Sequence, residues 1–86
     1  MRVILVYDVE QKRVAKVLKL VRRYLDWIQN SAFEGDITPS KLEELKTRLR
    51  KLIDPKKDSV VIFKMKGIPY EKETIGISKS STDKLL

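Results

Sequence analysis

The stretch RVILVY, from Arg2 to Tyr7, contains the longest apolar run of this sequence and ends directly before Asp8. Its side chains are apolar and mostly β-branched at successive positions, so a strand formed here must be covered on both faces. Such a strand belongs in the middle of a sheet. The rest of the fold therefore depends on which segments flank this strand and which cover it.

Two segments have the spacing of amphipathic helices. From Val14 to Leu25, apolar residues recur at intervals of three and four, and basic residues occupy the other sides. Gly35-Asp36 is expected to end the preceding strand. In the second helix, Thr38 suits the N-cap position and Pro39 the first helical position. The buried stripe of this helix consists of four leucines, Leu42, Leu45, Leu49 and Leu52.

The remaining segments have strand character. Trp27 to Glu34 (WIQNSAFE) contains a polar Gln29-Asn30-Ser31 step. One bent strand and a tight two-strand hairpin both fit this segment, and the hairpin is preferred. Ser59 to Met65 is rich in β-branched residues, and Thr74 to Ser78 is a last short strand. The chain from Lys79 to the end is polar, and we expect a flexible tail at 79–86.

The order strand, helix, two strands, helix, strand predicts an α+β, ferredoxin-like βαββαβ sandwich with an extra C-terminal strand, folded as a single domain over residues 1–86. Both helices then cover the same face of the sheet. The first strand nevertheless has apolar residues on both faces, for example Leu5 on one and Ile4 and Val6 on the other. Because a second copy is the simplest cover for the open face, we predict a homodimer through the sheet face. The last strand can also pair with the edge of the partner's sheet.

The charge of the chain indicates a polyanionic partner. Nineteen Lys and Arg against twelve Asp and Glu leave a formal net charge of +7. Basic residues form a stripe along the first helix that can contact nucleic-acid phosphates. The stripe consists of Lys12, Arg13, Lys16, Lys19 and Arg23. A solvated helix face explains the same stripe, and both interpretations stay open.

The sequence contains no cysteine and no histidine. Disulfides, the usual zinc ligands and the commonest general base are therefore excluded. A metal in this protein would be held by oxygen, hence Mg²⁺ or Mn²⁺. No apolar stretch is long enough to span a bilayer, and no signal-peptide pattern precedes the first strand, so we expect a cytoplasmic protein without a membrane partner.

Asp8 is the strongest candidate for chemistry because it follows the central strand, at the end of a sheet, where ligands tend to bind. One carboxylate holds Mg²⁺ poorly, but a two-fold dimer would bring a second Asp8. Capping of the following helix is the competing interpretation of Asp8, and the sequence pattern alone favours it. Glu10, Glu34 and Asp36 are candidates for a second ligand, although turn chemistry and solvated surface are the preferred explanation of these residues.

Two aromatic side chains and one hydroxyl complete the candidates. Phe33 and Trp27 can stack on bases, but an aromatic residue in a strand is more often part of the core. Core packing is preferred for Phe33, and both interpretations stay open for Trp27. Ser31 is not expected to act as a nucleophile, because no histidine is present to activate it.

Taken together, these segments resemble the second CRISPR-associated core protein family, small ferredoxin-like proteins that work beside the CRISPR integrase. The most specific match is the Gln-x-Ser-x-Phe-Glu-Gly run between the two helices. The matching pieces cover nearly the whole chain in the order of the family: VYDV at 6–9, the helix around 13–17, IQNSAFEGDIT at 28–38, LEELKTRLRKLID at 42–54 and DSVVIF at 58–63.

The resemblance implies a homodimer whose facing Asp8 residues share one Mg²⁺ between the subunits. It also implies an endonuclease activity on single-stranded RNA or double-stranded DNA. Tyr7, Ser31 and Phe33 would lie near that centre, and Arg13 resembles a family arginine on the first helix. Many relatives carry a glycine before the second strand and an arginine at the position of Trp27, and this chain has neither.

The resemblance also implies a non-catalytic role in spacer acquisition, in which the dimer bridges two integrase dimers and holds spacer-precursor DNA along its basic surface. Ile75 to Leu86 is a candidate segment for docking the integrase. A third interpretation is a toxin-type RNA nuclease of the same fold. RNA-recognition modules expose aromatic residues on the open sheet face, whereas we expect aliphatic residues there, namely Val3, Leu5, Val60 and Ile62.

Overall fold

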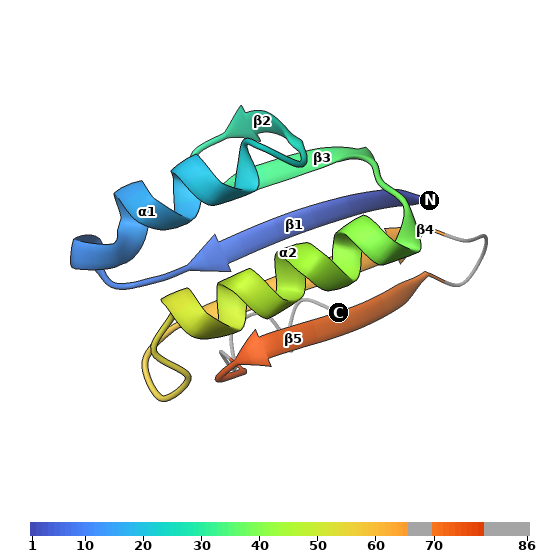
Figure 1. The fold of residues 1–86 in the computed structure, drawn as a ribbon. Coiled ribbons are helices and arrows are strands. Elements are labelled where there is room, and N and C mark those ends of the chain that lie inside the picture. Colours follow the sequence, from blue (N-terminus) through green and yellow to red (C-terminus); the bar gives the residue numbers. More distant parts are fainter. Residues whose placement is uncertain (66–69, 79–86) are drawn as a thin grey trace.

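A computed structural model describes residues 1–65 and 70–78. Its elements follow one another as β1 (Arg2–Asp8), α1 (Gln11–Val21), β2 (Asp26–Gln29), β3 (Ala32–Asp36), α2 (Pro39–Leu52), β4 (Ser59–Met65) and β5 (Glu71–Gly76). The strands form one antiparallel sheet in the order β2-β3-β1-β4-β5, with β1 in the centre (Figure 1). This confirms the predicted α+β sandwich with an extra C-terminal strand. The predicted tail at 79–86 lies outside the described residues.

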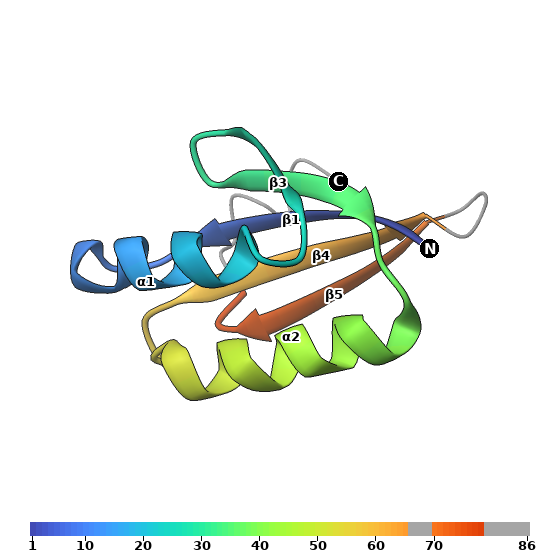
Figure 2. The ribbon, with the colours of Figure 1, turned by 45° about the horizontal axis from the view of Figure 1, so that its top comes forward.

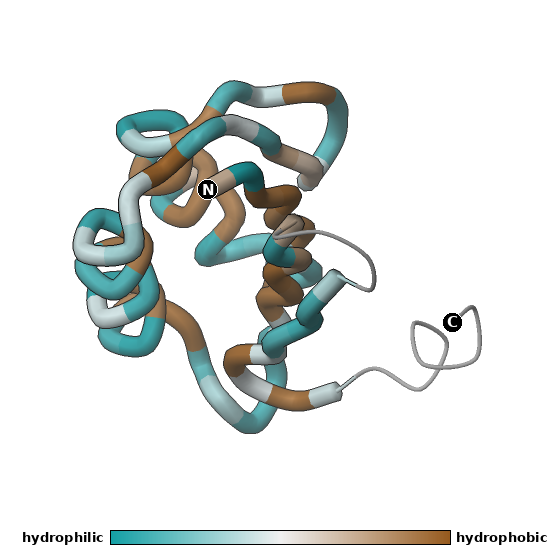
Figure 3. Tube along the Cα trace, turned by 90° about the vertical axis from the view of Figure 1, so that its right-hand side faces the viewer, coloured by the Kyte–Doolittle hydropathy of each residue, from teal (hydrophilic) through white to brown (hydrophobic). Residues whose placement is uncertain are grey.

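Both helices cover the same face of the sheet (Figure 2). The alternation along β1 fixes this arrangement, because Val3, Leu5 and Tyr7 point toward the helices and are buried. Hydropathy follows the same layering, with apolar residues concentrated in the central strands and hydrophilic residues on the outer sides of the helices (Figure 3). The helices contribute further core residues, Val17 and Val21 from α1 and Leu42, Leu45 and Leu49 from α2.

The other face of the sheet is apolar and lacks a helix. Val6 and Met65 lie on this face and remain 36% and 37% exposed. Ile4 and Phe63 are cross-strand partners there and are partly buried. The prediction that Val3, Leu5, Val60 and Ile62 form this face was wrong, because all four are fully buried under the helices. A continuous apolar strand does not indicate in its sequence which face points outward.

The segment between the helices forms the predicted hairpin of β2 and β3. Its turn places Asn30 at a positive φ of 45°, and the pairing register shifts between Trp27 and Gln29. The prediction that Gly35-Asp36 breaks the strand was wrong, because both residues belong to β3 and pair with β1. A Cβ on Gly35 would lie 3.3 Å from the Leu25 side chain, so this glycine permits a close approach.

The ends of the other elements follow local chemistry. The Thr38 hydroxyl accepts a hydrogen bond from the Lys41 N–H at 3.2 Å, which confirms the predicted cap of α2. The last strand runs from Glu71 to Gly76 instead of from Thr74 to Ser78, and it pairs with β4 of the same chain. In the part of the chain that the structure describes, no helix is long and apolar enough to cross a membrane.

Candidate functional site

Asp8 is the last residue of β1 and is exposed at the end of the sheet. The N-cap position of α1 is occupied by Glu10, so the interpretation of Asp8 as the N-cap residue was wrong. Asp8 lines a hollow of about 230 Å³ together with residues from the end of β1, the segment after it, α1 and the β2–β3 turn. These residues are Tyr7, Val9, Val14, Asn30 and Ser31.

Three of the predicted site residues meet beside Asp8. The backbone N–H of Tyr7 donates to the carbonyl oxygen of Ser31 at 3.1 Å, which ties the hairpin turn to the end of β1. The Tyr7 ring stacks on Phe33, with the ring centroids 6.1 Å apart. Burial raises the pKa of the Tyr7 phenol, which therefore stays protonated at neutral pH. Phe33 is fully buried, which confirms core packing and leaves no ring face for a base.

The other candidate ligands do not join Asp8. Glu34 and Asp36 lie near the opposite end of β1, where each is 3.4 Å from the guanidinium of Arg2. Glu10 accepts a hydrogen bond from Arg13 at 2.9 Å. Over residues 1–65 and 70–78, no three His, Cys, Asp or Glu side chains gather closely enough to hold a metal ion.

Arg13 points inward, toward a second aspartate at the same end of the sheet. Its Nε and Nη2 atoms donate to the two carboxylate oxygens of Asp58, which is fully buried. Backbone N–H groups of Glu10 and Asp54 also donate to this carboxylate, at 2.9 and 2.8 Å. These bonds hold the pKa of Asp58 far below its usual range and raise the pKa of Arg13.

We call Asp58, Arg13, Glu10 and Asp54 the Asp58 cluster. The role of Asp58 was not predicted from the sequence, although its position offered a signal. Asp58 comes directly before β4, and β4 pairs antiparallel with β1. The start of β4 therefore lies beside the end of β1 and the loop that follows it. Arg13 was expected on the exposed basic stripe, and the structure gives its guanidinium two carboxylate partners instead.

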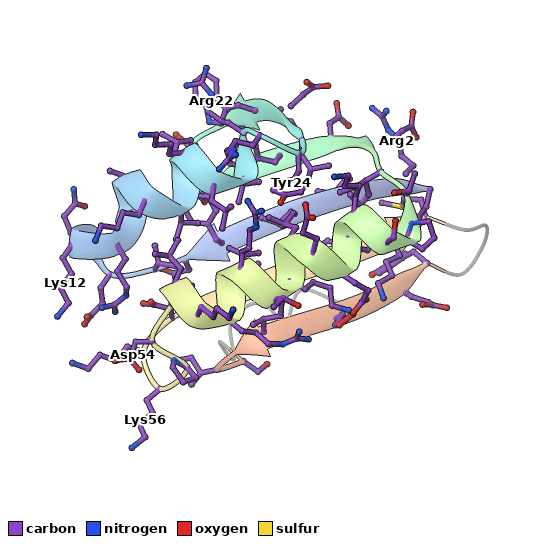
Figure 4. The ribbon with its side chains drawn as sticks, viewed as in Figure 1. Arg2, Lys12, Arg22, Tyr24, Asp54 and Lys56 are labelled. Atoms are coloured by element: carbon purple, nitrogen blue, oxygen red, sulfur yellow. The ribbon has the colours of Figure 1, made fainter. Side chains whose placement is uncertain are left out.

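The other members of the basic stripe are exposed. Lys12 points outward at the start of α1 (Figure 4). Lys16, Lys19 and Arg23 line a groove between the two helices. Trp27 is 55% exposed, and its indole N–H donates to the carbonyl oxygen of Asn30 at 3.0 Å, so it is not a core residue.

The fold and the site define a small two-layer α+β protein with an exposed aspartate at the end of its central strand. The family model for "CRISPR associated protein Cas2" matches residues 1–73, and the chain belongs to this family. The resemblance seen in the sequence is thereby confirmed.

Curated relatives extend this similarity over most of the chain. The "CRISPR-associated endoribonuclease Cas2" of Thermotoga maritima is 50% identical over 80 residues and 92% of each chain. The protein of the same name from Pyrococcus furiosus is 43% identical over 86 residues and the full length of both chains.

Solved structures show the same fold. A chain described as "Crystal structure of cas2" has a TM-score of 0.74 at 42% identity, with 93% of this chain and 91% of that chain covered. Streptococcus pyogenes Cas2 at pH 6.5 has a TM-score of 0.65 at 28% identity, with 100% and 95% covered.

Proposed function

We propose that this protein is a metal-dependent endonuclease of CRISPR adaptation that works as a homodimer in the cytoplasm. Two Asp8 carboxylates, one from each subunit, would hold a shared Mg²⁺ or Mn²⁺. The observation that carries the proposal is the position of Asp8, exposed at the end of β1 and next to the apolar sheet face that lacks a helix. The names of the relatives support RNA as a substrate, and duplex DNA is the second candidate.

The side chains around Asp8 suit a hard cation. Asp8, Asn30 and Ser31 line one hollow, and the side chains of all three residues contain oxygen, which Mg²⁺ prefers. A single chain supplies the Asp8 carboxylate, and its described residues contain no group of three or more His, Cys, Asp or Glu side chains that could hold a metal ion. A second copy placed on the open sheet face would supply the second carboxylate. When bound, Mg²⁺ activates the attacking water and stabilises the charge that develops on the phosphate.

Other residues would support the site without reacting. The protonated Tyr7 phenol cannot serve as a base, and the chain contains no histidine for that role. The hydrogen bond from Tyr7 to Ser31 holds the hairpin turn beside Asp8. Lys12, exposed at the start of α1, is close in sequence to the site and would contact the phosphates of the bound strand.

A second role follows from the basic surface and needs no cleavage. Lys12, Lys16, Lys19 and Arg23 are exposed on or just after α1. We propose that the dimer also assembles with the CRISPR integrase on spacer-precursor DNA, with cations outside the groove between the helices, such as Lys12, in contact with the DNA phosphates. This adaptor role depends on the dimer and the positive charge but not on the carboxylate of Asp8.

The decisive experiment compares wild type, Asp8→Asn and the control Asp36→Asn in two assays. Asp36 is also exposed on the sheet but lies at the opposite end of β1. The first assay measures Mg²⁺-dependent cleavage of single-stranded RNA and duplex DNA, and the second measures assembly with the integrase on DNA of spacer length. We expect Asp8→Asn to reduce cleavage by about 100-fold or more and to assemble normally. Asp36→Asn should behave as wild type in both assays.

Two outcomes contradict parts of this proposal. Undiminished cleavage by Asp8→Asn would place the reaction at another site. If wild type fails to cleave either substrate with Mg²⁺ or Mn²⁺ but assembles with the integrase, the nuclease proposal is wrong and the adaptor role remains.

A further inference from the structure

A groove runs between the two helices on the side away from the sheet, and neither Asp8 nor the open sheet face takes part in it. It has a volume of about 450 Å³. Its residues, which we call the helix groove, are Lys16, Lys19, Leu20, Arg23, Arg48, Lys51 and Leu52. Five of these seven residues are cations, two are leucines and none is a carboxylate. Leu20 and Leu52 are only partly buried and form an apolar floor between basic walls.

The groove continues into a second hollow of about 520 Å³. Arg23 and Arg48 line both hollows. The Arg48 guanidinium lies 5.9 Å from the centre of the Tyr24 ring, and the Tyr24 hydroxyl donates to Glu44 at 2.6 Å. These contacts fix the junction between the two hollows. The second hollow extends from α2 and the segment after α1 to the end of β3, and Asp36 and Glu44 also line it. Tyr24 lies between the two helices (Figure 4).

The chemistry of this surface indicates what it binds. Phosphates of a nucleic acid would pair with the basic walls but would leave Leu20 and Leu52 in contact with water. A helix that alternates carboxylates with apolar side chains satisfies both features, since its apolar side covers the leucines while its carboxylates reach the cations. We propose that the helix groove docks an acidic, amphipathic helical segment of a partner protein.

A second copy of this chain does not fit that description. The sequence contains one pair of adjacent acidic residues, Glu43-Glu44, and the structure places it on α2 itself. Glu44 is bonded to Tyr24 and Glu43 to Lys46, so both already have partners. A chain with a net charge of +7 also repels its own basic groove. The occupant is therefore a different, acidic protein, and the inference does not rest on the nuclease activity.

Binding can be tested on the full chain with a synthetic probe. The probe is a fluorescent peptide of about 14–20 residues, long enough to follow α2, with leucines at helical spacing and glutamates at the other positions. A scrambled peptide of the same composition keeps the charge and loses the apolar side. A duplex DNA of about 30 base pairs reports on phosphate binding, and fluorescence anisotropy at several salt concentrations measures all three affinities.

Three double variants separate the floor of the groove from its walls. Leu20→Gln with Leu52→Gln removes the apolar floor, and Lys19→Gln with Lys51→Gln removes two cations from the walls. Arg22→Gln with Lys56→Gln removes the same charge at positions that point away from the groove (Figure 4). Thermal unfolding of each variant checks its folding.

We expect the patterned peptide to bind at least about tenfold more tightly than the scrambled peptide. The floor and wall variants should each weaken patterned-peptide binding about tenfold, whereas the control should change it less than about twofold. Binding of the duplex should not change in the floor variant. On unmodified protein, the amide NMR signals that shift with the peptide should belong to α1 and α2, a measurement that needs no variant.

Three results would overturn the proposal. Equal affinity for the two peptides would show that net charge alone determines binding and that the apolar floor plays no part. NMR shifts around Asp8 or on the open sheet face would place the peptide elsewhere. If the wall variant weakens only duplex binding, the groove is a nucleic-acid surface.

Discussion

Two aspartates at the same end of the sheet have opposite environments. Asp8 ends β1 opposite Ser59, and Asp58 directly precedes Ser59 at the start of β4. Asp58 is fully buried and accepts two hydrogen bonds from Arg13 and one from each of two backbone N–H groups. Asp8 is exposed at a hollow that Asn30 and Ser31 also line. The same type of side chain thus has a structural role at Asp58 and is exposed to solvent at Asp8, although the two residues lie at the same end of the sheet.

The buried aspartate also fixes the position of the exposed one. The Asp58 carboxylate accepts hydrogen bonds from the N–H of Asp54, just after α2, and from the N–H of Glu10, just before α1. Glu10 follows Asp8 by two positions in the chain. The Asp58 carbonyl oxygen accepts a hydrogen bond from the Ile77 N–H at 3.0 Å, which ties the end of β5 to the same point. We make four predictions from the contrast between the two aspartates. The largest effect is expected from the loss of the buried carboxylate.

Asp58→Ala should lower the free energy of unfolding by about 3–5 kcal/mol, because it leaves the Arg13 guanidinium and two backbone N–H groups without their buried acceptor. Urea denaturation measures this difference. Asp36→Ala is the matched control, since Asp36 is exposed and its loss should change the free energy by less than about 0.5 kcal/mol. A cost below about 1 kcal/mol for Asp58→Ala would contradict the structural role of the cluster.

The contribution of Asp58 should depend on pH in the acid range. Its pKa is lowered on folding, so its stabilising effect is complete above the pKa of an unfolded aspartate, about 3.9. The effect is lost as the pH falls from about 4 toward the lower folded-state pKa. The difference in unfolding free energy between wild type and Asp58→Ala should thus be constant from about pH 5 to 7 and should shrink between about pH 4 and 2.

Urea titrations of both proteins at several pH values measure this dependence. The pKa values of Glu44 and Glu73 are also lowered, but these residues titrate in wild type and variant alike, so their effects cancel in the difference. A difference that stays constant down to about pH 2 would show that folding does not lower the pKa of Asp58.

Gly76→Ala should have an intermediate effect, because Gly76 packs against the backbone of Asp58. Its φ is +89°, and an added Cβ would lie in steric conflict with the Asp58 carbonyl oxygen. The expected cost is about 1–3 kcal/mol, measured as a lower midpoint of thermal unfolding. Gly35→Ala is the comparison, since its Cβ would meet the movable end of the Leu25 side chain at 3.3 Å. If Gly35→Ala costs more than Gly76→Ala, close packing on Asp58 is not what fixes the end of β5.

The sequence predicted the features that depend on local patterns. The hairpin, the burial of Leu42, Leu45 and Leu49 in α2 and the Thr38 cap follow from periodicity and from the chemistry of neighbouring residues. Leu52, which was predicted in the same buried stripe, is only partly buried. The exposed end of β1 at Asp8 follows from where the apolar run stops.

The features that the sequence did not predict depend on contacts between distant positions. Arg13 and Asp58 are 45 positions apart, so their pairing becomes visible only in the folded chain. Local rules predict that Gly35 ends a strand. In the structure, Gly35 lies inside β3, and the close approach of the Leu25 side chain explains why a glycine occupies this position. The wrong assignment of Val60 and Ile62 to the open face has a similar cause, because a strand that is apolar on both faces carries no mark of which face the helices cover.

Asp8→Asn should have the smallest effect on stability, below about 0.5 kcal/mol without metal, because the carboxylate is exposed and the amide has the same shape. The proposed shared Mg²⁺ makes a further difference. Since a bound ligand stabilises the folded state by mass action, Mg²⁺ should raise the unfolding midpoint of wild type but not that of Asp8→Asn. Thermal unfolding with and without Mg²⁺ tests this independently of cleavage. Equal stabilisation of both proteins would place the ion elsewhere, and a large loss of stability in Asp8→Asn would make Asp8 a structural residue like Asp58.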